Sequence, residues 1–166
     1  MKIKAGSTDK VNGKLVKFKP GDCLSINCGN GNFIAAIISE KFNKYYDLTL
    51  LEYYKKSKPV LADFTNGKFW GTRVGYWDAL TYATERKMIL YKYIDDCQGI
   101  ELVTNLSIID NLEKASYSYL DGIPQLVDYY LTHIQRRLEK TQNAEKFPEL
   151  SFYGEHLVPM KNIIKQ

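Results

Sequence analysis

The chain has 166 residues, of which 45% are hydrophobic and 25% are charged. That length suits one domain, and that composition excludes a disordered chain. No stretch reaches the roughly 20 apolar residues of a membrane span, and the N-terminus lacks the apolar core of a signal peptide. Three cysteines, Cys23, Cys28 and Cys97, are an odd count typical of reduced thiols in a cytosol. We therefore expect a single cytoplasmic domain over residues 1–166.

Strands dominate the predicted structure from residue 14 to residue 104. The pattern consists of period-two alternation, an Asn30-Gly31 hairpin signal and an uninterrupted apolar run typical of a strand covered on both faces. The segments that carry it are 23–28, Phe33–Ile38 and Lys44–Tyr54. Together they predict a three-stranded antiparallel meander over about 15–54.

The predicted elements beyond Pro59 are shorter. We expect a second hairpin from Leu61–Phe64 and Lys68–Val74, with its turn at Asn66-Gly67. Residues 75–86 fit either a short helix or a long loop. Further strands are expected at Lys87–Ile94 and Ile100–Thr104.

The C-terminal part is predicted to contain one helix over about 124–142. Pro124 suits a first helical turn, and an apolar stripe follows at a spacing of four residues. The stripe consists of Leu126, Tyr130, Ile134 and Leu138. Residues 146–166 are expected to form an irregular tail. The predicted fold class is α+β, with a curved, mainly antiparallel sheet that is barrel-like in its N-terminal part and a packed C-terminal helix.

Residue types that serve in catalysis and metal binding occur without the spacing that such sites need. The two histidines, His133 and His156, belong to no metal-binding motif, and Cys23 and Cys28 fall on opposite faces of one predicted strand. Gly29-Asn30-Gly31 lacks the lysine of a phosphate-binding loop. We expect no catalytic centre, no metal and no cofactor.

Charge is segregated along the chain. Residues 1–19 contain six lysines and one aspartate, for a net charge of +5, whereas residues 95–128 contain seven acidic residues and one lysine, for a net charge of −6. Such asymmetry steers encounters with charged partners, although a solvated face is the simpler interpretation of any single charge. The adjacent carboxylates Asp95 and Asp96 fit a turn, because neighbouring side chains point in different directions.

Nucleic acid is a weaker candidate partner. The N-terminal lysines are suited to contact phosphates, and aromatic rings can stack on bases. The aromatic residues, however, cluster at 42–54 and 64–93, away from these lysines. The pI of about 8.8 is also below that of typical basic binding domains.

One region resembles a known family. A Pro-Gly-Asp sequence enters a strand, a glycine-bearing turn follows, and a strand of small apolar residues comes next. These segments are Lys19–Ile26, Gly29–Phe33 and Ile34–Ser39, and the similarity continues through Tyr46-Asp47 and Lys58–Leu61. Over residues 17–75 the chain resembles the immunity-protein-26-like family of bacterial polymorphic toxin systems.

This resemblance implies a cytoplasmic protein that binds and neutralises a cognate toxin without catalysis. A basic nuclease is one such toxin, and the acidic segment 95–128 would suit it. We expect the toxin-binding residues to include acidic groups and aromatic anchors of the kind found at binding hot spots. The candidates are Asp95, Asp96, Glu101, Trp70, Tyr76 and Trp77. Both tryptophans are equally plausible core residues.

The Pro-Gly-Asp opening also resembles that of small-barrel ribonucleases of toxin–antitoxin systems. Such an enzyme needs an arginine or an acid–base group over a concave face that binds RNA. Arg73 and Arg86 could serve in that role, but nothing in their spacing singles them out. The sequence leaves two alternative functions, a small-barrel ribonuclease-type toxin and a basic nucleic-acid-binding module.

Overall fold

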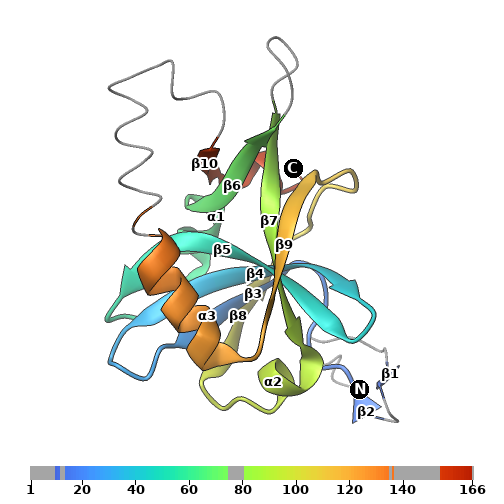
Figure 1. Ribbon diagram of the computed structural model, residues 1–166, viewed down its shortest axis with the longest axis vertical. Coiled ribbons are helices and arrows are strands. Elements are labelled where there is room, and N and C mark those ends of the chain that lie inside the picture. The colour runs from blue at the N-terminus through green and yellow to red at the C-terminus, as the bar shows by residue number, and fades with distance from the viewer. Residues whose placement is uncertain (1–9, 12–13, 75–80, 135, 137–153, 166) are drawn as a thin grey trace.

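The computed structural model describes residues 10–11, 14–74, 81–134, 136 and 154–165 (Figure 1). Its main element is one sheet of eight strands, mostly antiparallel. These strands are β3 (Asp22–Asn27), β4 (Phe33–Phe42), β5 (Tyr45–Lys55), β6 (Lys68–Val74), β7 (Thr81–Leu90), β8 (Ile100–Asn105), β9 (Lys114–Leu120) and β10 (Gly154–Pro159). A separate short pair is formed by β1 (Lys10–Val11) and β2 (Lys14–Leu15).

Short helical segments complete the described fold. They are α1 (Leu61–Thr65), α2 (Tyr91–Asp95), α3 (Ile123–Tyr129), a π-helical turn over Tyr130–Ile134 and a 3₁₀ turn over Met160–Asn162. The α+β class, with a mainly antiparallel sheet and a few short helices, is confirmed.

The order of the strands across the sheet is β10-β6-β7-β5-β4-β3-β8. β9 pairs in parallel with β7, and β5 contacts both β6 and β7. The predicted meander is confirmed as β3, β4 and β5. Residues 34–38 of β4 are fully buried, as expected for a central strand that is covered on both faces.

The sheet ends at β10 and β8 and does not close into a barrel as a continuous ladder. Among the described residues, the segments that follow these two end strands meet in one isolated bridge, between Ile108 and Ile164. Two backbone hydrogen bonds flank it, from Ile109 N–H to the Ile163 carbonyl at 2.9 Å and from Lys165 N–H to the Ser107 carbonyl at 2.8 Å.

The two faces of the sheet support separate cores. On the first face, alternate residues of β3, β4 and β5 pack with α3, and this first core includes Leu24, Ile38, Leu48 and Leu126. On the second face, the intervening residues pack with α1, β10 and the chain that follows β10. The second core includes Cys23, Ile37, Leu51, Phe64 and Met160. Cys23 and Cys28 therefore lie on opposite faces, as predicted.

The second predicted hairpin is wrong in its first arm. Residues Leu61–Thr65 form α1, and only Lys68–Val74 is a strand. The Val60 N–H donates to Asp63 Oδ2 at 2.8 Å, which satisfies a backbone group at the start of the helix. Phe64 is then buried in the second core. A short apolar run is compatible with either element, so burial decided between them.

The strand expected at Lys87–Ile94 is also displaced. β7 covers Thr81–Leu90, and the chain then turns into α2. Tyr91 and Ile94 are both buried, and their separation of three residues places them on one side of a helix. Of residues 75–86, the part from Thr81 onward is strand, and 75–80 lie outside the described residues.

The C-terminal expectations were partly wrong. α3 begins at Ile123, close to the predicted start, and Leu126 and Tyr130 of the predicted stripe are buried in the first core. Most of the predicted helix beyond Ile134 lies outside the described residues. The tail is not irregular at Gly154–Pro159, because β10 pairs with β6 in register along its whole length. β9 likewise places a strand beyond residue 104, the predicted limit of the strand-rich part.

Candidate functional site

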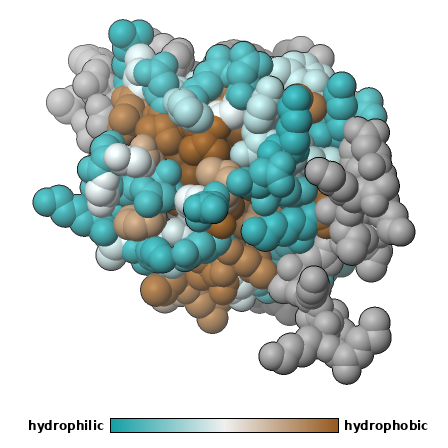
Figure 2. Space-filling view, turned by 90° about the horizontal axis from the view of Figure 1, so that it is seen from below, coloured by the Kyte–Doolittle hydropathy of each residue, from teal (hydrophilic) through white to brown (hydrophobic). Residues whose placement is uncertain are grey.

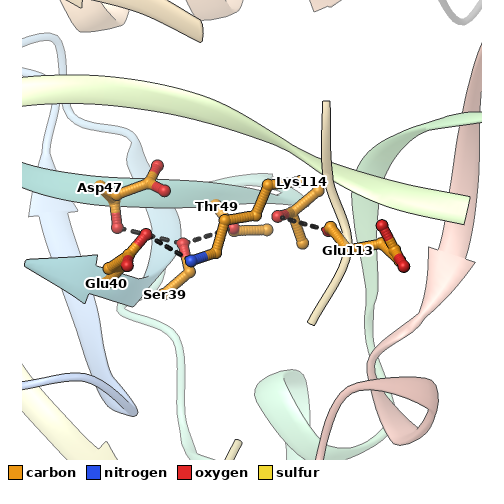
Figure 3. A network of polar contacts seen from close by, with 7 residues as sticks. Ser39, Glu40, Asp47, Thr49, Glu113 and Lys114 are labelled. Carbon is orange, nitrogen blue, oxygen red and sulfur yellow. Dashed lines mark hydrogen bonds and ion pairs between the residues drawn. The ribbon is translucent and has the colours of Figure 1, made fainter. Parts of the chain in front are cut away.

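A polar network lies on the second face, near the turn that joins β4 to β5 (Figure 3). Ser39 Oγ donates to the Asp47 carbonyl at 3.1 Å and lies 2.9 Å from Thr49 Oγ1. All three side chains are buried. The register of β4 and β5 shifts between Ile38 and Glu40, and this irregularity places Glu40 opposite Asp47. Buried polar groups of this kind require partners, so the network stabilises one arrangement of the two strands.

β9 brings further charge to the same network. The Lys114 ammonium forms an ion pair with the Glu40 carboxylate, and both groups are partly buried. The neighbouring Glu113 carbonyl accepts the Thr84 N–H at 3.0 Å and the Thr84 hydroxyl at 3.4 Å. The start of β9 is therefore attached both to β7 and to the irregular part of β4.

Two exposed aromatic rings and one half-buried ring lie next to this network. Phe42 is 57% exposed and Tyr119 is 53% exposed. Tyr45 lies opposite Phe42 across the hairpin, and its ring contacts the Tyr119 ring edge-on, with centroids 5.1 Å apart. Because Tyr46 and Leu48 belong to the first core, Tyr45 and Asp47 face the other side of the strand. We call Phe42, Tyr45 and Tyr119 the aromatic surface.

The predicted site residue Asp95 is engaged inside the molecule. Its Oδ1 accepts the Tyr46 hydroxyl at 2.5 Å, and its Oδ2 accepts the Lys17 N–H at 3.3 Å. The Tyr46 oxygen in turn accepts the Phe18 N–H at 3.0 Å. Burial raises the pKa of Asp95, against the opposing effect of these hydrogen bonds, and burial also raises the pKa of Tyr46. This arrangement attaches the segment before β3 to the end of α2.

The other two predicted acidic residues, Asp96 and Glu101, are exposed. Asp96 follows the last residue of α2. Glu101, on β8, accepts two contacts from the Lys58 ammonium, at 2.8 and 3.0 Å. Both members of that pair are more than half exposed, so the ion pair adds little to stability.

Of the predicted aromatic anchors, Trp70 alone lies in the part of the chain that the structure describes. Trp70 is buried in the first core. It lies beside Tyr130 and lowers the pKa of that phenol, although burial has the larger effect and raises this pKa to about 12. The ring is therefore a core residue in this structure. Tyr76 and Trp77 lie outside the described residues.

The Pro-Gly-Asp motif that carries the family resemblance forms a structural corner. Gly21 has a φ of 90°, and a Cβ there would lie 2.1 Å from the Leu106 carbonyl oxygen. The buried Asp22 carboxylate accepts the Lys19 N–H at 2.9 Å and the Asn105 amide at 2.8 Å. These contacts connect the start of β3 to the end of β8. The motif thus has a structural role at this corner.

Side chains that could hold a metal ion do not converge within the described part of the chain. No group of three or more histidine, cysteine, aspartate or glutamate residues is suitably arranged there. The cysteines are free thiols, and burial raises the pKa of Cys23 to about 12 and also raises that of Cys28. No described helix is long and apolar enough to cross a membrane.

Comparison with known proteins identifies no relative. No family model matches the sequence, and neither a curated protein nor a solved structure is significantly similar to it. The function is therefore argued from the residues and their geometry.

The aromatic surface was not among the predicted site residues. The alternation over Lys44–Tyr54 already places Tyr45, Asp47 and Thr49 on one side of a strand. It does not indicate which side is covered, and it gives no hint that Tyr119 would lie beside Tyr45. That contact depends on the parallel pairing of β9 with β7, which joins residues far apart in the chain.

Proposed function

We propose that this protein is a cytoplasmic immunity protein that binds a bacterial toxin and neutralises it in a one-to-one, non-covalent complex, with no catalytic step of its own. The resemblance of residues 17–75 to the immunity-protein-26-like family supports this role. The single observation that carries the binding role is the aromatic surface, in which Phe42 and Tyr119 keep more than half of their area exposed. Exposed tyrosine and other aromatic rings are enriched at the centres of protein interfaces.

Exposed carboxylates support a basic partner such as a nuclease toxin. Asp96, Asp121 and Asp128 are exposed and come from α2, the chain before α3, and α3 itself. A nuclease needs positive charge to hold phosphate, and acidic groups on an inhibitor speed its association with such a surface. Seen from the α2 end, the molecule also presents hydrophobic areas among its hydrophilic side chains (Figure 2).

We further infer that the sheet is strongly curved, in a barrel-like manner, around the second core. The bridge between Ile108 and Ile164 supports this curvature, because it brings together the chain beyond the two end strands. The second core draws on both ends of the sheet as well, through Val103 of β8 and Val158 of β10. Such a sheet would present the β4–β5 hairpin as a projecting edge.

Co-expression with the product of the adjacent upstream gene tests the immunity role. We expect that product to arrest growth when it is expressed alone, and we expect co-expression of this protein to restore growth. Size-exclusion chromatography of the purified pair should give one complex of one-to-one stoichiometry. An upstream product that is harmless alone, or that still kills in the presence of this protein, would refute the proposal.

Nucleic acid is the second candidate partner, and the same aromatic rings favour it. Bases stack on exposed rings, and the exposed Lys44 at the tip of the hairpin is suited to contact a phosphate. Titration with a single-stranded oligonucleotide at two salt concentrations distinguishes this function, because phosphate contacts give a steep salt dependence. For the ribonuclease alternative, reproducible cleavage of total RNA that is abolished by Arg73→Ala would favour an enzyme.

A further inference from the structure

We infer, on the basis of the proposed immunity function, that the aromatic surface is the toxin-docking surface and that it receives an arginine or lysine side chain of the toxin. The inference names the place on this protein and the chemistry of the group that it binds. It rests on the exposure of Phe42 and Tyr119, on the contact between the Tyr45 and Tyr119 rings and on the carboxylates nearby.

Exposure and preorganisation are the first argument. Phe42 lies in the last position of β4, and Tyr45 begins β5, so both rings are held on strands rather than on a long loop. Tyr119 lies near the end of β9, and its ring already contacts Tyr45. A partner would therefore meet a Tyr45–Tyr119 pair that is already in contact before binding. Rigid aromatic side chains bind at a low cost in conformational entropy.

The electrostatics of the rings are the second argument. The face of an aromatic ring attracts a cation placed within about 6 Å of its centroid. The molecule uses this interaction elsewhere, since Lys92 Nζ lies 5.0 Å from the centre of the Tyr93 ring and Lys87 Nζ lies 4.5 Å from that of Tyr129. The aromatic surface presents the same chemistry to the outside.

Carboxylates at the margins of the aromatic surface are the third argument. Glu40 lies two residues before Phe42 on the same strand face, about 7 Å along the strand. Its carboxylate is partly exposed and also forms the ion pair with Lys114. Asp121 is exposed and follows Tyr119 by two residues. An arginine that stacks on a ring can also reach a carboxylate with its planar fork of N–H groups, which makes this combination selective for a basic side chain.

A second exposed apolar site supplies a matched control. Val60 is 59% exposed and Leu61 is 50% exposed, both at the start of α1. Their exposure is comparable to that of Phe42 and Tyr119, but they are aliphatic and have no ring to attract a cation. If exposed apolar area alone mattered, the two pairs would contribute equally to binding.

The experiment compares two double variants of the full chain, Phe42→Ala with Tyr119→Ala and, as the control, Val60→Ala with Leu61→Ala. Affinity for the product of the adjacent upstream gene is measured by calorimetry, and protection is measured by co-expression. We expect the first double variant to weaken binding about 100-fold or more, as truncation of two hot-spot rings does, and the control to change it less than about 3-fold. The Glu40→Gln variant should weaken binding less and should reduce its salt dependence.

The outcomes separate the docking surface from the immunity function. If wild-type protein protects the cell and the first double variant binds as tightly as wild type, the docking surface is refuted and the immunity function stands. If wild-type protein neither binds nor protects, both are refuted. If an oligonucleotide binds wild-type protein and the first double variant loses that binding, the surface serves nucleic acid and the inference is overturned. Thermal midpoints check folding, and the single variant Phe42→Ala, at the most exposed ring, provides a second test with an expected loss of about 10-fold.

Discussion

Tyr45 and Tyr46 are neighbours in β5 and lie in opposite environments. The Tyr46 ring is fully buried in the first core, packs against the Phe18 and Tyr91 rings, and donates its hydroxyl to Asp95. The Tyr45 ring lies on the other face, in contact with the exposed Tyr119. One residue of register thus separates a fully buried tyrosine from one on the opposite face of the strand.

Two of the buried tyrosines, Tyr46 and Tyr130, share a second property, which is that their hydroxyls connect distant segments. Tyr46 joins the segment before β3 to α2 through Phe18 and Asp95. The Tyr130 hydroxyl donates to the Leu51 carbonyl at 3.1 Å and accepts the Tyr53 N–H at 3.0 Å, which attaches the end of α3 to β5. The tyrosines of this chain therefore include internal cross-connections on the first face as well as the Tyr45–Tyr119 ring contact on the second.

The largest expected effect comes from truncating the two neighbouring tyrosines separately. Tyr46→Ala should lower the free energy of unfolding by about 3–5 kcal/mol, because it removes a fully buried ring and its hydrogen bonds. Tyr45→Ala should lower it by about 1 kcal/mol or less, since it removes mainly one ring contact. Urea denaturation of both variants measures the difference. Equal losses in the free energy of unfolding would contradict the difference in burial between Tyr45 and Tyr46.

A smaller effect is expected from deleting single hydroxyl groups. Tyr130→Phe should destabilise the fold by about 1–3 kcal/mol, because it leaves the buried Leu51 carbonyl and Tyr53 N–H without this partner. The matched control is Tyr54→Phe, whose hydroxyl accepts only side-chain amides of Asn30 and Asn32 near the surface. The control should lose less than about 1 kcal/mol. A larger loss in the control, measured by the same denaturation, would contradict the assigned role of Tyr130.

The smallest expected effect is the pH dependence that Asp95 confers. Burial raises its pKa in the folded state, so the folded state holds this proton more tightly than the unfolded state does. The stabilising contribution of Asp95 is therefore fully present below the unfolded pKa of about 3.9 and declines as the pH rises through the higher, folded value. Relative to Asp95→Asn, the wild-type protein should lose stability over that interval. Parallel stability profiles of the two proteins, recorded by urea denaturation from acidic to neutral pH, would show that the carboxylate is not desolvated.

The meander of β3, β4 and β5 could be predicted because its signals are local. Alternation across 23–28, glycines at Gly29 and Gly31 with positive φ, and the apolar run in β4 each act within a few residues. The segments with weak local signals were misassigned. Leu61–Thr65 became a helix because Phe64 packs into the second core, and β10 became a strand because β6 offered an edge.

The candidate site follows the same division. Alternation was sufficient to predict a strand with Tyr45 and Asp47 on one side. Which tyrosine is buried, whether Trp70 is an anchor or a core residue, and which acidic residues are already engaged all depended on packing between distant segments. Those contacts join Tyr45 to Tyr119 and Tyr46 to Asp95. A pattern along the chain specifies how side chains alternate, whereas burial is a property of what the rest of the chain places against each side.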